Sequence, residues 1–503
     1  MDYSTLRMAL LASTVAELES RIQRLVQSRM EDLLNEVTQF FSRPLSPFST
    51  QEFECGLRAA LQELGRVIME WTLNELDPED GDTLPKVVRF EAGEYRREST
   101  KTRNGSVATT FGEIVLWRYP YRFRQRESEP KIFPLELMLG LNHGATPALA
   151  DLVSRAMAET GASQNQVLER LRSEHRVRWG AQRLCNVVKE EADAAKEMRH
   201  QFQVAQLLEL LNTARESRGK NKPILAVGRD GISVSLQPRA IWQVASVATV
   251  SVYDRQGKRL GTVYLAQMPE SKQVTLTGQL SDLIRDVMQQ WEGPFPRLCY
   301  ITDCGENETQ FYRRVLCQMR DPRRPQKRLP WVRIVDYYHA CERITTIGEA
   351  LFRKGTVAAT SWSKRMRKSL LQPNGPSRVL HSAATHYSKL KKKLGKTRKD
   401  DYRRATSYLR TRTRFMDYAQ YRKQQLPIGS GITEAACKSV FAQRMKLSGM
   451  RWKKPGGQAI LDLRTILMSG IWNQVRNAVL DAKQPTVKLP YGHREKTTST
   501  NAA

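Results

Sequence analysis

The spacing of apolar residues changes several times along the chain, and each spacing predicts a different kind of element. Over residues 4–41 the apolar positions keep heptad spacing with a one-residue shift, which predicts one long helix. A Pro- and Ser-rich link at 43–50 precedes a second predicted helix at 51–76. The heptads suit either a dimer seam or packing of the first helix on the second, and we favour the packing.

From 87 to 125 the apolar period becomes two, which predicts a small β unit. The dipeptide Asn104–Gly105 between its two halves is a hairpin signal and predicts the turn there. A face of Arg, Tyr and Trp side chains on this unit suits contact with a DNA backbone, or an ordinary half-exposed hairpin.

Residues 147–198 read as helices again, with one ending at Gly161, the next opening behind Ser163 and a third following. Helices separated by short turns suit a helix-turn-helix DNA reader with Arg183 on the last helix. An ordinary three-helix packing unit fits the same pattern.

Apolar strands begin at residue 222 and predict a mixed α/β sheet. One run, 222–231, ends in Asp230, and β-rich segments broken at Pro238 and Gly257 follow it. After a predicted helix at 271–291, a second apolar strand ends in Asp303, and WVRIVDYYHACERI (331–344) predicts a strand that runs into a helix.

Between 345 and 425 no strand pattern occurs, and the segment is helical and basic. Residues 387–423 carry 14 Lys and Arg against three acids, which favours contact with a DNA backbone. An amphipathic helix is expected at 458–480, before a polar tail that we expect to be disordered. The expected domains are 1–80 (helical, for dimerisation or DNA binding), 81–140 (β-rich), 141–215 (helix-turn-helix-like), 220–344 (core, first part), 345–426 (basic helical insertion), 427–482 (core, C-terminal helices) and 483–503 (tail).

Charge narrows the class of partner. The chain has 81 Lys and Arg against 52 Asp and Glu, a formal net charge of +29, which favours a polyanion, usually nucleic acid. Composition alone fits a DNA-binding protein, an RNA-binding protein or a ribosome-associated or chaperone-like protein equally well. No stretch approaches 18 consecutive apolar residues, and no signal-peptide pattern opens the chain, so we expect a cytoplasmic, nucleoid-associated protein that does not bind a membrane. Seven cysteines without a CxxC pair indicate reduced thiols. LGKT (394–397) lacks the preceding Gly of a phosphate loop, so no nucleotide cofactor is expected.

Three carboxylates stand out as candidate chemistry. Asp230 and Asp303 each follow an apolar strand and precede a Gly, which places them at the edge where open α/β sheets form their sites. Two carboxylates side by side favour a hard divalent cation with oxygen ligands. In PIGSGITEAACKSV (427–440), Glu434 lies in the first turn of a predicted helix. It could merely favour the helix N-terminus, contributing ~0.3–1 kcal/mol, or it could complete a site for two Mg²⁺ ions.

The order GRDG, ITDCGENE, VDYYHACERI and GSGITEAACKSVFAQRMKLSGMRWKKPGGQAIL resembles bacterial insertion-sequence DDE transposases of the Mutator-like branch. The resemblance covers roughly 220–475 and implies an RNase H-like mixed-sheet core interrupted by an all-helical insertion. It implies that Asp230, Asp303 and Glu434 are the catalytic, metal-binding triad for two Mg²⁺ ions, which Mn²⁺ could replace. Asp336 and His339 match the family's C/D-x-x-H motif, and His339 would be catalytic or simply buried. Glu306 and Glu308 compete weakly as the functional acid.

The implied function is transposition: binding of the terminal inverted repeats, cleavage, and joining of 3′-hydroxyl ends to target DNA by a homodimer or higher homo-oligomer. A catalytically inactive DNA-binding derivative and an RNase H-like structure-selective nuclease remain open. Cysteine pairs that we would expect around the β unit of such enzymes are missing from 88–135, so no zinc is expected there. Side chains expected to contact DNA are Arg183, Lys391, Lys392, Arg403, Arg404, Arg410, Lys438, Arg444, Lys446, Arg451 and Trp452.

Overall fold

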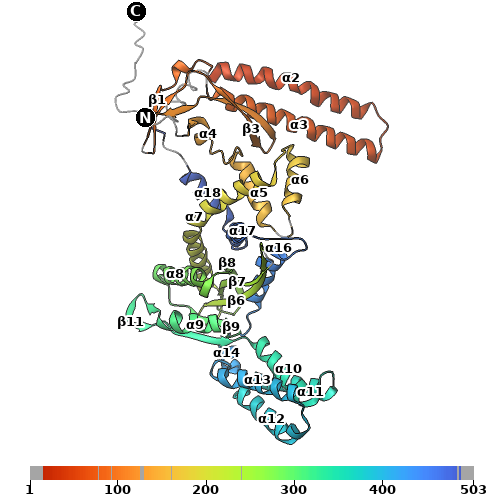
Figure 1. Cartoon of the computed structure of the whole chain (residues 1–503), viewed down its shortest axis with the longest axis vertical. Helices are drawn as coiled ribbons and strands as arrows, with labels where there is room; N and C mark the ends of the chain where they lie inside the picture. The colour runs from red at the N-terminus through yellow and green to blue at the C-terminus, as the bar shows by residue number, and fades with distance from the viewer. Residues whose placement is uncertain are drawn as a thin grey trace, which may run out of the picture. The chain divides into compact units, whose positions relative to one another are not determined.

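The computed structural model describes residues 15–77, 79–91, 93–124, 130–159, 161, 163–238, 241–483 and 487–488. The chain divides into two compact units. The first unit comprises 1–157, 162–191 and 476–503, and the second comprises 158–161 and 192–475. The long helix α7 (Ala181–Glu216) contributes residues to both units. The elements are mixed α and β, as the apolar spacing predicts (Figure 1).

In the first unit, α2 (Val15–Phe41) packs on α3 (Pro47–Glu75), as we favoured from the sequence. The rings of Phe40 and Phe53 stack with centroids 4.6 Å apart, and Arg21 pairs with Glu75 at 2.7 Å. Ser46 begins α3 with a reciprocal capping box. The part of the predicted helix before Val15 lies outside the described residues.

The β part of this unit comprises β1 (Val87–Phe90), β2 (Gly93–Arg97), β3 (Thr102–Thr109), β4 (Gly112–Arg118) and β5 (Tyr121–Phe123). The predicted turn at Asn104–Gly105 is wrong, because these residues lie inside β3 at an irregularity in its register with β4. The turn follows Thr109, which pairs with Gly112, and Gly112 takes a φ of +139° that favours glycine. The first predicted strand is also divided, because the chain turns at Glu91 between β1 and β2.

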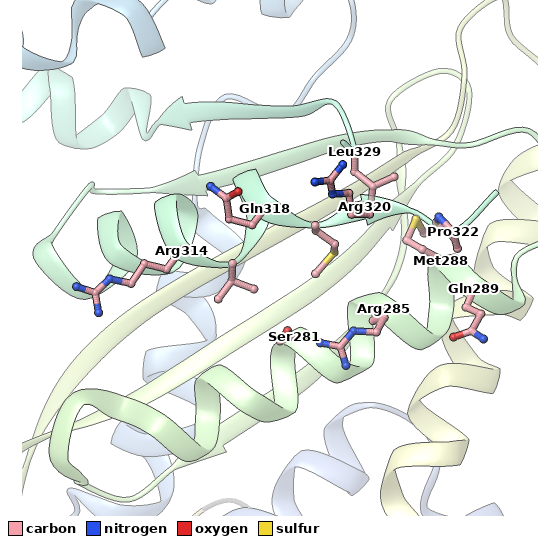
Figure 2. A pocket seen from close by; sticks show the side chains of 11 residues that line it. Ser281, Arg285, Met288, Gln289, Arg314, Gln318, Arg320, Pro322 and Leu329 are labelled. Carbon is pink, nitrogen blue, oxygen red and sulfur yellow. Dashed lines mark hydrogen bonds between the residues drawn. The ribbon is translucent and has the colours of Figure 1, made fainter. Parts of the chain in front are cut away.

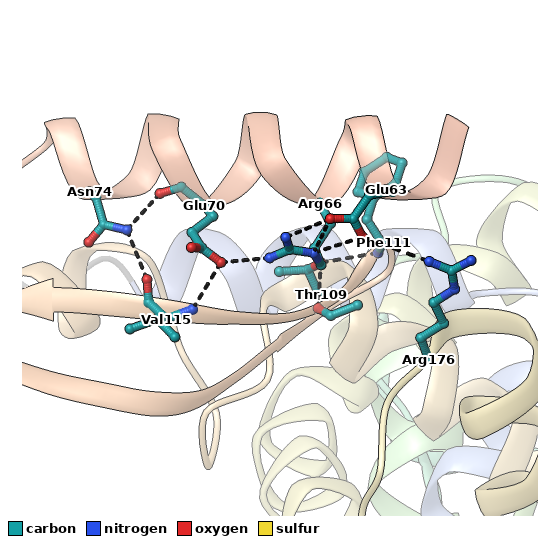
Figure 3. A network of polar contacts seen from close by, with 9 residues as sticks. Glu63, Arg66, Glu70, Asn74, Thr109, Phe111, Val115 and Arg176 are labelled. Carbon is teal, nitrogen blue, oxygen red and sulfur yellow. Dashed lines mark hydrogen bonds and ion pairs between the residues drawn. The ribbon is translucent and has the colours of Figure 1, made fainter. Parts of the chain in front are cut away.

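A polar network joins α3 to β4 (Figure 3). The Asn74 side chain donates to the Val115 carbonyl at 2.8 Å, and the Glu70 carboxylate accepts from the Val115 backbone N–H at 3.3 Å. Arg66 lies between Glu63 and Glu70, with ion pairs of 2.7 Å to each. The hydrogen bond from Arg66 holds the pKa of Glu63 below its usual value, although burial opposes the shift. The helix is thus tied to the sheet edge by its polar side chains.

The predicted helical run after the β unit is confirmed. It contains α5 (Pro147–Ala158), α6 (Gln164–His175), which Ser163 caps, and α7. The short helix α4 (Pro134–Met138) also belongs to this unit, and α18 (Trp472–Ala482), like α7, contributes residues to both units.

The second unit is built on a mixed five-stranded sheet in the order β12-β9-β6-β7-β8. The strands are β6 (Ile224–Leu236), β7 (Ile241–Tyr253), β8 (Arg259–Gln267), β9 (Arg297–Thr302) and β12 (Trp331–Val335). Strands β6, β7 and β8 are antiparallel neighbours, while β9 runs parallel to both β6 and β12. The turns at Pro238 and Gly257 fall between strands, as predicted.

Helices cover both faces of this sheet. On one face, apolar side chains of β6 to β9 share a core with α7, α8 (Val274–Gln290) and α9 (Glu306–Arg314). On the other face the core continues into a helical group in which α10 (Tyr337–Phe352) begins directly after β12. That group also contains α11 (Val357–Leu370), α12 (Gly375–Leu390), α13 (Lys396–Arg412) and α14 (Tyr418–Lys423) (Figure 1).

The chain returns to the sheet through α15 (Gly431–Ala436), a π-helical turn at Cys437–Ala442 and α16 (Gln443–Met445). The next helix, α17 (Lys454–Met468), packs on β8. A separate core cluster contains side chains from α15 to α17, from the C-terminal half of β6 and from the N-terminal half of β7. This return is what brings Glu434 to the sheet.

Candidate active site at the carboxyl edge of the sheet

Asp230 and Asp303 lie on neighbouring parallel strands. The register pairs Gly228 of β6 with Ile301 of β9, so two further residues along each strand bring Asp230 beside Asp303. The expectation that Asp230 ends its strand is wrong: β6 continues to Leu236 because β7 pairs with it along its whole length. Only the parallel pairing with β9 stops short of Asp230, and this opens the edge at which the two carboxylates meet.

Asp230 is held by two donors. Its Oδ1 accepts from the Gly231 N–H at 2.7 Å, and its Oδ2 accepts from the Cys437 thiol at 3.4 Å. Burial raises the pKa of Asp230 above its usual value, and the nearby charge of Asp303 raises that pKa further. Asp303 accepts from the Gly305 N–H at 2.9 Å, and its carbonyl accepts from the Tyr408 hydroxyl at 2.7 Å. The repulsion that the charge of Asp303 exerts on Asp230 makes this edge attractive to a cation.

Glu434 approaches the same edge from α15. Its Oε1 accepts from the Ser430 hydroxyl at 3.3 Å and lies 3.4 Å from Nε2 of His339. The other ring nitrogen of His339 is 3.1 Å from Glu342. Burial alone would lower the pKa of His339, but the hydrogen bond to Glu342 and the neighbouring Asp336 and Glu434 raise it overall. His339 is therefore a partner of Glu434 and is not enclosed in the apolar core.

Asp336 explains why His339 faces Glu434. It lies at the end of β12, is fully buried, and caps α10 by accepting from the His339 N–H at 2.9 Å. The same carboxylate accepts from the Ser430 N–H, and the Tyr337 N–H donates to the Ile428 carbonyl at 2.9 Å. One buried side chain thereby sets the start of α10 against the start of α15.

The absence of a side chain at Gly228 brings α15 down onto β6. A Cβ added there would lie 1.9 Å from the Thr433 hydroxyl, far inside contact distance. That hydroxyl shares a buried hydrogen bond of 2.8 Å with Thr249 of β7. Since Thr433 precedes Glu434, this close approach sets how near Glu434 comes to Asp230. The π-helical turn that follows carries Cys437, and such turns occur frequently at functional sites.

Glu308 is a carboxylate whose place sequence reasoning undervalued. It lies in the first turn of α9 and is buried, while Glu306 is exposed and bonded to Gln310. Burial raises the pKa of Glu308, and the charges of Asp303 and Asp230 act in the same direction, against the nearby Arg229. The only signal in the sequence is the spacing of five residues between Asp303 and Glu308. A helix that begins between these two residues places the Glu308 side chain near the end of β9.

The donors at this edge match a hard cation in kind, since carboxylate oxygens are the usual ligands of Mg²⁺. Within the described ranges, however, no group of three or more His, Cys, Asp or Glu side chains is arranged so that it could hold a metal ion. Glu434 is turned to His339 and Ser430, which leaves Asp230 and Asp303 as the adjacent pair. The carboxylates are therefore suitable ligands for Mg²⁺, although Glu434 contacts His339 and Ser430 instead of the two aspartates.

Most side chains expected to contact DNA are on the surface of the second unit. Two of the exposed arginines are paired with acids one turn away, Arg403 with Asp400 at 3.6 Å and Arg404 with Asp401 at 2.6 Å. Near Lys446, the exposed Trp242 presents a ring whose centroid is 5.5 Å from the lysine nitrogen, a contact the sequence did not suggest. The exposed members of the expected set are Lys391, Lys392, Arg403, Arg404, Arg410, Lys438, Lys446 and Arg451.

Three of the expected DNA contacts are engaged inside the protein. Arg183 donates to the carbonyls of His143 and Ser106, within the first unit. Arg444 is 1% exposed, and burial lowers its pKa to about 10. Trp452 is half-buried, and its indole N–H donates to the Met445 carbonyl at 3.0 Å. These residues hold loops and helices in place, because partners far along the chain bury them.

Comparison with known proteins does not place the chain in a family: no family model matches it, and no curated protein matches it. Among the helices of the described ranges, none has both the length and the apolar character that crossing a membrane requires.

Proposed function

We propose that this chain is a DDE-type DNA transposase with an RNase H-like core, as the sequence resemblance implies. The observation that carries the proposal is the meeting of Asp230, Asp303 and the Glu434–His339 pair at one edge of a mixed sheet. These residues come from four separate stretches of sequence, and the fold brings them together. A sheet of three antiparallel strands extended by two parallel ones, with helices on both faces, supports the RNase H-like assignment.

In the proposed reaction, each side chain has a defined task. Asp230 and Asp303 would supply oxygen ligands for Mg²⁺, and Glu434 would complete the set if it exchanged its contact with His339 for the ion. When bound, the metal would activate a water or a 3′-hydroxyl and stabilise the oxygen that leaves the phosphorus. Cys437 holds one oxygen of Asp230 by its thiol proton and so fixes the direction of the other. His339, held by Glu342 and the Asp336 cap, orients Glu434 and can donate to the scissile phosphate.

Binding would come from the basic surfaces rather than from the acidic edge. Lys391, Lys392 and Arg410 on the helical group and Lys438 and Lys446 near α15 are exposed cations that can neutralise phosphates. The helical group between β12 and α15 corresponds to the insertion that the resemblance implies, and it shares a core with the sheet. This continuity would hold DNA on the helices at a defined place relative to the carboxylates.

The test uses the DNA that flanks the gene as substrate, with Mg²⁺ or Mn²⁺, and measures both nicks and joined products. Asp230→Asn should abolish cleavage and leave DNA binding unchanged, because the amide keeps the volume and loses the charge. Asp481→Asn, an equally small change at an exposed position on α18, is the matched control and should cleave normally. Metal-dependent cleavage by the Asp230→Asn protein at the wild-type rate would refute the assignment.

A DNA-binding protein without catalytic activity is the second candidate, and the engagement of Glu434 by His339 and Ser430 favours it. Tight DNA binding with no nicks in either metal would establish this candidate. Cleavage without any joined product would instead indicate a nuclease.

A further inference from the structure

A second group of cations lies on the second unit away from the carboxylates, around the short hairpin of β10 (Arg320–Asp321) and β11 (Arg324–Arg328). Residues 313–328 contain seven Lys and Arg and one acid. The single acid, Asp321, is buried, accepts from the Arg323 N–H at 2.9 Å and pairs with Arg324 at 3.1 Å. The surface of the hairpin is therefore almost purely positive.

Arginines from different elements line a pocket of about 590 Å³ (Figure 2). Arg285 comes from α8, Arg314 from the end of α9 and Arg320 from β10, so three elements contribute one arginine each. The same pocket is lined by the apolar side chains of Met288, Val315, Met319 and Leu329. Arg285, Arg314 and Arg320 are exposed, and Arg285 pairs with Asp282 at 2.7 Å, so the positive groups at the edge of this apolar lining face the solvent.

The hairpin is held in place by its own arginines. Arg320 donates to the carbonyls of Pro325 and Gln326 at 3.2 and 3.3 Å. Arg323 donates to the Trp291 carbonyl and lies 4.4 Å from the centroid of the Phe295 ring. Within the described part of the chain, no hydrogen bond or ion pair engages the side chains of Arg314, Lys327 and Arg328. The hairpin is therefore held in place, while the side chains of Arg314, Lys327 and Arg328 are available to a ligand.

This surface lies at the end of the sheet opposite the carboxylates. Helix α9 begins three residues after Asp303 and ends at Arg314, so the nine residues of this helix, with a rise of ~12 Å from first to last, separate the two places. The hairpin leads directly into Trp331 at the start of β12, whereas Asp336 follows the other end of that strand. A molecule bound at the hairpin is therefore not at the carboxylates.

We propose that the hairpin surface, defined as Arg314, Arg320, Lys327, Arg328 and the pocket beside them, binds the phosphate backbone of duplex DNA. The inference rests on the proposed function and deepens it, because it assigns a further contact with the DNA backbone, apart from the bond being cut, to this end of the sheet. The ligand is identified by charge: free cations from α9 and β11, one buried acid and a neighbouring pocket suit a row of phosphates. An acidic protein partner is the competing occupant.

The experiment measures the affinity of the full chain for a 30-base-pair duplex across a range of salt, without divalent metal. Each phosphate contact contributes about 0.9 to the slope of log K against log salt. The variant Arg314→Ala/Lys327→Ala/Arg328→Ala should lower that slope by about 2 to 3. The control Lys364→Ala/Arg365→Ala/Lys368→Ala on α11 removes the same charge from exposed positions and should change the slope by less than about 1.

A charge-retaining variant, Arg314→Lys/Lys327→Arg/Arg328→Lys, should keep the wild-type slope and so separates charge from folding. An unchanged slope in the alanine variant, or an equal fall in the α11 control, would overturn the inference while the proposed function stands. An acidic protein partner at the hairpin would give the first of these results. Absence of any salt-dependent DNA binding by the wild-type chain would refute both.

Discussion

Replacement of Gly228 by Ala tests whether the approach of α15 to β6 positions the candidate site. The added Cβ would lie 1.9 Å from the Thr433 hydroxyl and 2.9 Å from the Thr249 hydroxyl, whereas ordinary contacts begin at 3.4 Å. Helix α15 must therefore move by about 1.5 Å, the difference between 1.9 and 3.4 Å, or Thr433 must rotate away from Thr249. Either change would displace Glu434, because Glu434 directly follows Thr433.

The magnitude follows from two losses. Forcing a methyl group into a packed site costs typically ~1–3 kcal/mol, and the buried Thr249–Thr433 hydrogen bond contributes ~1 kcal/mol. We expect the second unit to be destabilised by about 2–4 kcal/mol while remaining folded at 25 °C. A displacement of about 1 Å at a reacting group lowers a rate by about 100-fold, so DNA cleavage should fall by at least that factor.

Urea denaturation and single-turnover cleavage measure the two effects. Gly278→Ala on α8 is the control, because a Cβ there meets nothing within 4 Å. It should raise stability by about 0.5–1 kcal/mol and leave cleavage unchanged. The double variant Gly228→Ala/Thr433→Ala removes the clashing hydroxyl and should recover part of the activity. Wild-type stability and rate in Gly228→Ala, or no recovery in the double variant, would show that this contact does not position Glu434.

Three further predictions concern other residues. His339→Ala should slow strand transfer more than it weakens DNA binding, since His339 contacts Glu434; an equal loss in both assays would exclude that role. Arg444→Ala should destabilise the chain by ~2–4 kcal/mol through lost packing and leave the salt dependence of DNA binding unchanged, whereas the exposed Lys446→Ala should do the reverse. Because Arg66 holds the pKa of Glu63 below 4.5 in the folded state, Glu63→Gln should lower the melting temperature near neutral pH. That difference should shrink as the pH falls below 4.5 through the folded pKa, and a difference independent of pH would contradict it.

The pattern of residues close together in sequence was sufficient to predict many of the strands and turns of the second unit. The apolar runs before Asp303 and Asp336 are strands that pair in parallel, and the turns at Pro238 and Gly257 separate antiparallel neighbours. These features depend on residues close in sequence, where alternation and turn chemistry act directly. The candidate carboxylates could therefore be found before the fold was known.

Features decided by distant partners could not be found in this way. Asp230 lies within a longer strand because β7 pairs with β6 over thirteen residues. Asn104–Gly105 does not form the predicted turn because these residues lie in β3, which pairs with β4. Arg444 reads as a surface cation in its helix, yet its neighbourhood includes Arg464 from α17, and it is buried. Likewise, the resemblance names His339 as a candidate, but nothing in the sequence indicates that its side chain contacts Glu434, which follows it by 95 residues.

The hydrogen bonds around Asp336, which join the start of α10 to the start of α15, affect which parts of the chain can change in length over evolution. The polypeptide leaves the sheet at Tyr337 and comes back at Ile428, and the bond between their backbones closes the intervening excursion into a ring. Lengthening a closed loop costs only ~0.6 kcal/mol for each doubling. Tyr418 and Tyr421 anchor the returning limb by donating to carbonyls of β12, so that limb is constrained by the sheet. The outer pair α11 and α12 packs mainly on α10, so residues added at the exposed ends of these two helices would leave the carboxylates where they are.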